Sequence, residues 1–385
     1  MGKKQKGNGE GTIYKFKKTG LSIGQYFHNG KRHSVYQKKN EKIGDFKKRF
    51  NDILSSIHTG TYIEKSNESF ISILEKHIEQ KHSDGITSDS GYLRDVYTVN
   101  LIKNTCDNFI NKPIQKINAD DIEEAKQYIK QYAQNSIDKA WRLLNKTFKI
   151  AISRRKIIFN PMDDESLKKP ISSKETKKVE ALTKSEENKL RKVLNTTEKG
   201  HKYRNIVLLQ LDTGMRIGEV LARSKDDVDL KSNTLNIHNT LTKDIKGKVI
   251  LGKHTKTYNK RTNIDNGKRT ITMEDEVKRI IKEQLDSKIT NIHKLLFWDY
   301  ENNTFVSYYE INSWLKRINA KYKISKLDLS THVLRHTYIT RLREAGVDMK
   351  IIQYLVGHVE GSSITDDIYT SLSKEFIENE LKKVR

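Results

Sequence analysis

Apolar and polar positions alternate in three short runs near the start of the chain, after which the spacing becomes helical. The runs at 12–17, 22–28 and 32–37 predict three β-strands, and Asn29-Gly30, between the second and third runs, is typical of a tight hairpin turn. Between 43 and 57 the apolar residues recur at the spacing of one helix face. We expect a small antiparallel sheet with one helix packed against it.

The following hundred residues carry only helical spacing. One apolar stripe runs from Phe70 to Ile78 and another from Trp141 to Ile152. Between them, Asn118 is placed to cap a helix that carries Ile122, Ala125 and Ile129. From about 161 to 180 the apolar pattern stops, and prolines, serines and charged pairs predict an exposed linker.

A new domain begins after this linker. Thr183 and Glu186 have the spacing of a capping box, which predicts the start of a helix. Further on, the runs at 234–241, 248–251 and 268–272 alternate as β-strands do. Helices and short strands are therefore expected together in this part of the chain.

These patterns divide the chain of 385 residues into four parts. We expect a β domain at 1–62, a helical domain at 63–165, a linker at 166–180 and a mixed α/β domain at 181–385 that ends in a helix. The predicted fold class is therefore multidomain and mostly α with small β-sheets.

Charge adds a class of partner to this picture. The chain has 73 Lys and Arg against 49 Asp and Glu, a net charge of +24. The net charge is +10 over residues 1–65, +4 over 66–178 and +10 over 179–385. Such a surplus attracts polyanions, most often nucleic acid and sometimes an anionic membrane surface. The concentration at the small N-terminal sheet favours nucleic acid.

Composition excludes two classes of protein. A single cysteine, Cys106, permits no internal disulfide and fits a reducing compartment. No run approaches eighteen apolar residues, and the N-terminus lacks the apolar stretch of a signal peptide. We therefore expect a cytoplasmic protein, neither a secreted disulfide scaffold nor a membrane protein.

Two regions offer candidate DNA contacts. A three-stranded sheet with basic and aromatic side chains on its open face can enter a major groove. The candidates in the first domain are Lys17, Lys18, Tyr26, Arg32, Tyr36 and Lys38. In the helical domain, Arg154 and Arg155 follow the last predicted helix, where basic residues also compensate a helix dipole. A small β-α adaptor without a ligand is the alternative for the first domain.

Candidate catalytic residues lie in the last domain. Arg216 belongs to the sequence Thr-Gly-Met-Arg-Ile-Gly-Glu, and His332 and Arg335 are three positions apart, so they share a helix face. His358 follows a glycine, and Tyr369 comes after it. Each residue alone is more often a surface arginine or a packed histidine, but the ordered combination points to one site.

Together these residue types suit cleavage of a DNA phosphodiester. A tyrosine hydroxyl is a modest nucleophile that forms a reversible phosphoester. Arg216 and Arg335 can grip the two non-bridging oxygens of one phosphate and stabilise the charge of the transition state. His332 and His358 can exchange protons near neutral pH.

With these motifs the chain resembles the tyrosine recombinase (phage integrase) family, whose Arg, His-x-x-Arg, Gly-His and Tyr landmarks occur here in order. The resemblance covers the whole chain. It implies an arm-type DNA-binding β domain, a helical core-binding domain and a catalytic domain of the tyrosine recombinase type. It further implies a site-specific recombinase that integrates and excises a phage or conjugative transposon. The reaction would proceed through a 3′-phosphotyrosyl intermediate and a Holliday junction, without metal, ATP or another cofactor.

The family uses a hairpin lysine as the acid for the leaving 5′ oxygen. Lys256, followed by threonine, resembles that lysine, and Lys253 is its nearest competitor. The hairpin here is lengthened by residues 258–267, with a turn expected at Asn266-Gly267.

Two further assignments follow from the resemblance. Tyr369 is the expected nucleophile, whereas Tyr354 and Tyr338 are weaker candidates, because Tyr354 lies in an apolar helix. Glu219 is expected to be structural, by orienting Arg216 or closing a salt bridge.

Residues 374–385 predict a short amphipathic helix that must dock on another surface. One option is its own domain. The resemblance implies docking on a neighbouring subunit of a homo-tetramer on double-stranded DNA. It also implies a small excision factor and a host DNA-bending protein as partners, and a place at the bacterial nucleoid.

Three other functions compete with this interpretation. A type IB topoisomerase shares the catalytic logic but acts as a monomer and would not need the N-terminal domain. A non-enzymatic DNA-binding protein would have lost residues that are intact here. A metal-dependent nuclease needs clustered carboxylates, and neither Asp226-Asp227 nor Asp366-Asp367 has ligand-like partners, so no metal ligands are predicted.

Overall fold

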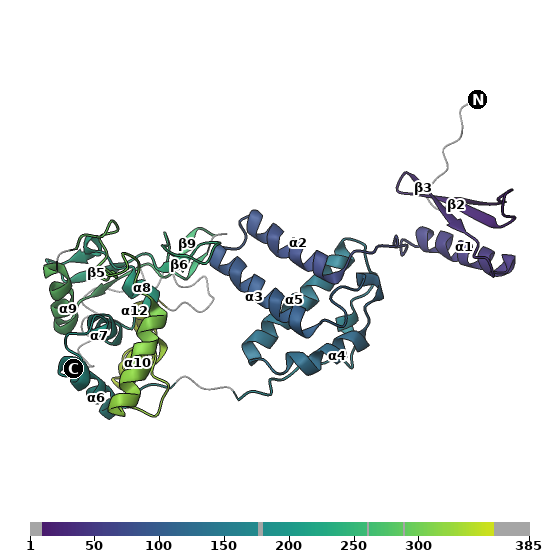
Figure 1. The fold of residues 1–385 in the computed structure, drawn as a ribbon. Coiled ribbons are helices and arrows are strands. Elements are labelled where there is room, and N and C mark those ends of the chain that lie inside the picture. The colour runs from purple at the N-terminus through teal and green to yellow at the C-terminus, as the bar shows by residue number, and fades with distance from the viewer. Residues whose placement is uncertain (1–9, 176–179, 260–261, 288, 358–385) are drawn as a thin grey trace. The chain divides into compact units, whose positions relative to one another are not determined.

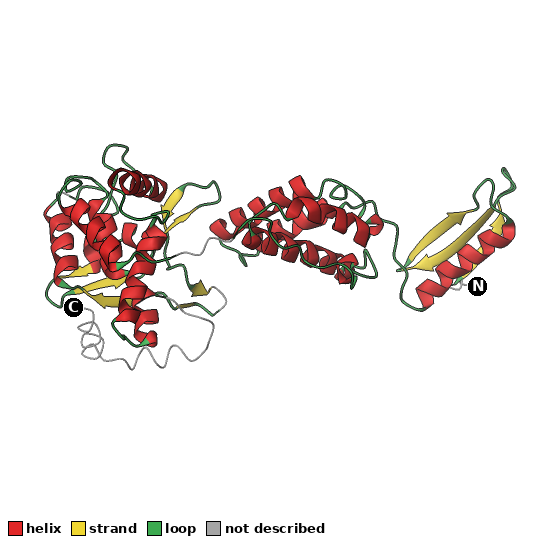
Figure 2. Cartoon of the chain, turned by 90° about the horizontal axis from the view of Figure 1, so that it is seen from below, coloured by secondary structure: helices red, strands yellow, loops and turns green. Residues whose placement is uncertain are grey.

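The computed structural model describes residues 10–175, 180–259, 262–287 and 289–357 (Figure 1). The chain forms two compact units, Met1–Lys81 with Asp95–Thr176 and His82–Arg94 with Lys177–Arg385. Helices dominate, and the sheets are small (Figure 2), which confirms the predicted mostly helical class. None of the helices in the described ranges is both long and apolar enough to cross a membrane.

The N-terminal part of the described chain has the predicted sheet and helix. The antiparallel strands β1 (Gly11–Lys15), β2 (Ser22–His28) and β3 (Lys31–Tyr36) lie side by side in chain order, and α1 (Ile43–His58) follows. Asn29 and Gly30 both have positive φ, as the predicted hairpin turn requires. The helix packs on one face of the sheet, where a side chain at Gly24 would collide with the ring of Phe50.

Four helices form the next part: α2 (Phe70–Ser83), α3 (Asp89–Thr105), α4 (Ala119–Ile129) and α5 (Gln134–Ser153). The ring of Phe70 on α2 lies 5.0 Å from that of Phe148 on α5 and 5.5 Å from that of Phe109, between α3 and α4. Asn118 caps α4 through a reciprocal bond with Asp121, as predicted. A 3-10 turn, η1 (Ile114–Lys116), precedes this cap.

The segment after α5 is less exposed than predicted. Asn160 caps a second 3-10 turn, η2 (Pro161–Asp163), which packs against α4 and α5. Pro161, Met162 and Leu167 are buried there, so the prediction of an exposed linker from about 161 was wrong. These apolar residues are too widely separated to show a periodic pattern, although they contribute to the core of the helical part.

Residues 180–357 combine helices with three small sheets. Their helices are α6 (Lys184–Asn195), α7 (Arg204–Thr213), α8 (Ile217–Leu221), α9 (Asp275–Asp286), α10 (Tyr308–Tyr322), α11 (Thr331–Glu344) and α12 (Met349–Val356), with a 3-10 turn η3 (Lys225–Asp227). The first sheet has the order β10 (Arg269–Thr272), β5 (Thr234–Ile237), β4 (Val228–Asp229). The other two are the pairs β6 (Leu241–Lys243) with β7 (Val249–Leu251) and β8 (Tyr258–Asn259) with β9 (Ile264–Asp265).

The core of this part is built around α7, whose residues are almost all buried and which contacts α8, α9 and α11. Thr183 and Glu186 form the predicted capping box at the start of α6. Ser330 caps α11 by accepting a hydrogen bond from the backbone nitrogen of Val333 at 3.5 Å. α11 carries His332 and Arg335, and Arg216 follows the C-terminal end of α7.

Candidate active site

Arg216 stands at the start of α8, where the chain turns sharply out of α7. Gly214 ends α7 with a left-handed backbone (φ 60°), and a side chain there would collide with the ring of Tyr338. Glycine is therefore required at this turn. Arg216 occupies the N-cap position of α8, and its backbone nitrogen donates to Oε2 of Glu219 at 3.1 Å. The turn thus fixes the direction in which the Arg216 side chain leaves the backbone.

Glu219 lies fully buried between two arginines. It accepts a hydrogen bond from Nη1 of Arg216 at 3.0 Å and one from Nη2 of Arg269 at 2.8 Å. Burial alone would raise the pKa of Glu219, but the positive charge of Arg269, followed by that of Arg216, holds it below its usual value. Glu219 is therefore ionised and orients Arg216.

Arg335 projects from α11 toward the same place. It is 8% exposed, and it donates Nη1 to the carbonyl oxygen of Gly214 at 2.7 Å and Nη2 to that of Val356 at 2.8 Å. Burial and the positive charge of Arg216 lower the pKa of Arg335 to about 9, which still leaves the guanidinium cationic at neutral pH. Two positive groups are thus held beside each other with N–H donors to spare.

Lys256 and His332 belong to the same cluster of charges. Partial burial, with the positive charges of Arg216 and Arg335, lowers the pKa of the Lys256 ammonium. Partial burial and the nearby charge of Lys256 in turn lower the pKa of His332. His332 is consequently a neutral imidazole at neutral pH, able to accept a proton.

The turn that carries Lys256 is held by the inserted β8–β9 hairpin. The backbone nitrogen of Thr255 donates to Oδ2 of Asp265 at 2.8 Å, and the Thr255 hydroxyl donates to the same carboxylate. Lys253 and Lys256 are both exposed as residues, although the Lys256 ammonium is partly buried. The added residues therefore support the turn of Lys256.

The lengthened hairpin contains two turns, one of them at the predicted place. β8 and β9 pair Tyr258 with Asp265 and Asn259 with Ile264, so the chain reverses between Asn259 and Ile264. Asn266 and Gly267 form the predicted turn, in which the backbone nitrogen of Lys268 donates to the carbonyl oxygen of Asp265 at 3.1 Å, and this turn connects β9 to β10. An Asn-Gly pair signals a turn, but it does not say which two strands the turn connects.

Arg269 is a site residue that the sequence did not reveal. Its side chain is 1% exposed and, besides Glu219, donates to the carbonyl oxygens of Gly267 at 2.9 Å and Leu355 at 2.8 Å. The available signal was its position in the strand pattern, because Arg269 and Ile271, two residues apart, share the buried side of β10. A charged residue at an inward position calls for a buried partner.

Two predicted catalytic residues and one predicted helix fall outside the part of the chain that the structure describes. These are His358, Tyr369 and the predicted helix at 374–385. The description ends at Gly357, which caps α12 with a left-handed backbone. Of the competing tyrosines, Tyr354 donates its hydroxyl to the carbonyl oxygen of Thr270 at 3.0 Å.

Among the candidate DNA contacts, Tyr26 is a wrong prediction. Its ring lies on the face of the sheet that α1 covers, 3% exposed, and its hydroxyl is hydrogen-bonded to that of Tyr62. The register of β2 explains the error. Tyr26 lies two residues after Gly24, so both point to the face that α1 covers and not to the open face. The other candidates are exposed, with Arg32 and Tyr36 on the open face of β3: Lys17, Lys18, Arg32, Tyr36, Lys38, Arg154 and Arg155.

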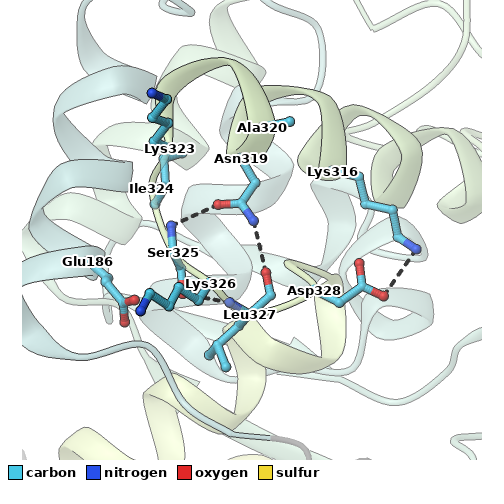
Figure 3. Close-up of a pocket in the computed structure, with 10 residues that line it drawn as sticks. All are labelled: Glu186, Lys316, Asn319, Ala320, Lys323, Ile324, Ser325, Lys326, Leu327 and Asp328. Carbon is cyan, nitrogen blue, oxygen red and sulfur yellow. Dashed lines mark hydrogen bonds and ion pairs between the residues drawn. The ribbon is translucent and has the colours of Figure 1, made fainter.

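A pocket of about 530 Å³ lies between the end of α10 and the start of α6, and none of the described candidate catalytic residues lines it (Figure 3). Its polar groups pair with one another: Lys316 with Asp328 at 3.2 Å, and Asn319 with the backbone of Ser325 and Leu327 at 2.9 Å each. Asn319 thereby braces the loop that leads into α11. Within the described ranges, no three His, Cys, Asp or Glu side chains are grouped as metal ligands would be.

Known proteins share both the sequence pattern and the fold. Residues 180–375 match the phage integrase family and residues 69–169 match the phage integrase SAM-like domain. A probable integrase of prophage ps2 from Lactococcus lactis is 26% identical over 317 residues, which are 80% of this chain and 78% of that protein.

Among solved structures, the Tn1549 transposon integrase in complex with a circular intermediate DNA has a TM-score of 0.63 at 21% identity, over 82% of this chain and 99% of that one. A lambda integrase tetramer bound to a Holliday junction has a TM-score of 0.51 at 15% identity, over 92% and 93% of the two chains. The family match covers the whole described cluster from Arg216 to Arg335, and the chain therefore belongs to the phage integrase family of tyrosine recombinases.

Proposed function

We propose that this chain integrates and excises a mobile element by site-specific DNA strand cleavage and exchange. The observation that carries the proposal is the cluster of Arg216, Arg335, Lys256 and His332, three cations and a neutral imidazole held together by a buried framework. In the proposed reaction the Tyr369 hydroxyl attacks the scissile phosphate and forms a 3′-phosphotyrosyl bond, without metal or ATP.

Each group in the cluster has one part in this reaction. The guanidinium groups of Arg216 and Arg335 bind the non-bridging oxygens and offset the negative charge that grows in the transition state. Neutral His332 accepts a proton or donates a hydrogen bond, with His358 as its proposed partner. Lys256 protonates the departing 5′ oxygen, for which its lowered pKa makes it a better acid than an ordinary lysine.

Covalent trapping tests this proposal. Wild-type protein, incubated with a duplex that carries the ends of its element and a nick beside the cleavage point, should remain attached to the DNA after denaturation. An intact pair of sites should in addition exchange strands through a Holliday junction. Relaxation of supercoiled DNA without exchange would favour a type IB topoisomerase, and the absence of any adduct would contradict DNA cleavage by this chain.

Replacement of Lys256 tests the proposed acid. Lys256→Ala should slow cleavage by roughly 10²–10⁴-fold, the usual contribution of a positioned acid. A substrate with sulfur in place of the leaving 5′ oxygen should restore the rate, because a thiol has a pKa of about 8.5 and leaves without a proton. Lys253→Ala is the matched control and should cleave both substrates at the wild-type rate. The opposite result would exchange the roles of the two lysines.

The N-terminal sheet is proposed to bind accessory arm sites. Its open face presents Arg32, whose guanidinium lies 5.2 Å from the centre of the Phe27 ring, and Tyr36, which is 66% exposed. A cation beside aromatic rings on a twisted sheet suits a DNA groove lined with phosphates. In the proposed division of the chain, 1–62 binds arm sites, 63–165 binds the core site, 166–180 is the linker and 181–385 is catalytic.

Arg32→Ala should weaken binding to arm-site DNA and reduce the slope of log affinity against log salt by about 0.9, the share of one phosphate contact. Lys48→Ala removes the same charge from an exposed position on α1, which covers the other face of the sheet, and should leave that slope unchanged. Equal effects of the two substitutions would show that general charge, not the sheet face, binds the DNA. Fluorescence titration at several salt concentrations measures both.

The assembly is proposed to be a homo-tetramer on DNA, linked by the helix at 374–385. The lambda integrase tetramer on a Holliday junction supports this arrangement by its similar fold. A small excision factor and a host DNA-bending protein are proposed as partners, and the nucleoid as the place of action. The net charge of +24 is consistent with a protein that binds DNA over several domains.

A further inference from the structure

Three arginines hold the C-terminal end of α12, whose last carbonyl groups have no partner inside the helix. Each of three successive carbonyl oxygens accepts a hydrogen bond at 2.8 Å from a different side chain: Leu355 from Arg269, Val356 from Arg335 and Gly357 from Arg216. Two of these arginines form the proposed phosphate clamp. The third, Arg269, is too deeply buried to contact a phosphate, so it must act through its neighbours.

Arg269 connects the two ends of this arrangement. Its Nη2 donates to Glu219, the carboxylate that also orients Arg216, while its Nε donates to the carbonyl oxygen of Leu355 on α12. Its Nη1 donates to the carbonyl oxygen of Gly267 on its own segment. One planar group therefore joins β10, the start of α8 and the end of α12.

Gly357 brings the backbone of α12 against this guanidinium. It has φ 60°, and a Cβ atom there would lie 2.5 Å from Nη1 of Arg269 and 3.4 Å from Nη1 of Arg216. Only glycine combines the left-handed conformation with such an approach. His358 is the next residue in the sequence, so the place where α12 ends decides where the segment with the remaining catalytic candidates begins.

We propose that Arg269 is a positioning residue for DNA cleavage, which holds the end of α12 in register with the Arg216–Glu219 pair. This inference rests on the proposed cleavage function. Arg269 acts on the reaction through two contacts: its ion pair with Glu219 fixes the direction of the Arg216 fork, and its bond to Leu355 fixes the start of the segment that carries His358 and Tyr369.

The geometry requires an arginine. A guanidinium donates in three directions of one plane, which matches the three acceptors around Arg269. A lysine at this position would keep the charge opposite Glu219 but could not reach all three acceptors in one plane. The positive charge of Arg269 at the C-terminal end of α12 also interacts favourably with the helix dipole.

The test compares Arg269→Gln with Arg204→Gln in the full-length protein. Arg204 is a matched control, because it is also a buried arginine that donates to a helix end, the carbonyl oxygen of Leu194 on α6 at 3.0 Å, away from the site. Single-turnover cleavage of the nicked duplex, DNA affinity and amide hydrogen exchange are measured for each variant. Arg269→Lys is included as a variant that retains the charge.

We expect Arg269→Gln to cleave about 10²-fold more slowly, the scale of a small misplacement of reacting groups, with DNA affinity within about twofold of wild type. Amides of α12 should exchange faster, and those of α10 should not. Arg204→Gln should loosen α6 and leave the cleavage rate unchanged. Arg269→Lys should give an intermediate rate.

A wild-type cleavage rate for Arg269→Gln, or unchanged exchange in α12, would overturn the positioning role. If this variant exchanges faster throughout residues 180–357, Arg269→Lys decides the question: slow cleavage with protected α10 supports positioning, and wild-type cleavage overturns it. If the wild-type protein cleaves no DNA, the proposed function fails, and the exchange of α12 still tests whether Arg269 holds this helix end.

Discussion

A Tyr369→Phe variant is expected to bind its DNA sites with wild-type affinity and to form no covalent adduct on the nicked duplex. The substitution removes one oxygen atom, and in the proposed reaction that oxygen becomes the bond to the DNA. The arginine pair remains to hold the phosphate, so binding does not depend on the hydroxyl. Denaturing gel electrophoresis of the trapped product measures the adduct, and a mobility shift measures the affinity.

Tyr354→Phe is the matched control, because it removes the same atom from a tyrosine of the same domain. The Tyr354 hydroxyl donates to the carbonyl oxygen of Thr270, a contact that joins α12 to β10. Its loss should cost about 1 kcal/mol of stability at most and leave adduct formation in place. An adduct with the Tyr369→Phe variant, lost only in Tyr354→Phe, would assign the nucleophile to α12.

Local signals in the sequence predicted the elements of this fold well. The Asn29-Gly30 turn, the Asn118 cap and the capping box at Thr183 each depend on contacts within a few residues, so the chain itself specifies them. The mostly helical class with small sheets followed from the same periodicities. The family was predicted from residues whose order along the chain is more specific than any one of them.

Long-range contacts account for what the sequence did not predict. Tyr26 was expected among the basic and aromatic side chains on the open face of the sheet, but it lies with Gly24 on the face that α1 covers, as the close approach of Gly24 and Phe50 shows. Arg269 was predicted only as part of the strand at 268–272, since its partners Glu219 and Leu355 lie far away in sequence. The pattern of a single sequence does not show which distant residues Tyr26 and Arg269 contact.

The buried framework also explains how the positive groups can stay together. Arg216, Arg335 and Arg269 repel one another, and Glu219 supplies one compensating negative charge in their midst. The carbonyl oxygens at the end of α12 contribute partial negative charge as well. The site thus retains a net positive charge, which the negative charge of a bound phosphate would offset.

Arg216→Lys is expected to slow cleavage by roughly 10²–10³-fold, the cost of losing one preorganised donor to the transition state, while DNA affinity stays within about twofold. Lysine keeps the positive charge but not the fork. Arg216 uses Nη1 for Glu219 and Nη2 for the carbonyl oxygen of Gly357, and a single ammonium group cannot hold both and still face a phosphate.

Arg279→Lys is the matched control for this loss. Arg279 lies 41% exposed on α9 and pairs with Glu276 and Glu283, outside the cluster, so the same substitution there should leave the cleavage rate unchanged. Because both variants keep the net charge, the salt dependence of binding should also stay the same. A difference confined to the rate would locate the effect of Arg216 in the transition state, whereas equal rates for Arg216→Lys and wild type would contradict the phosphate clamp, since charge alone would then suffice for cleavage.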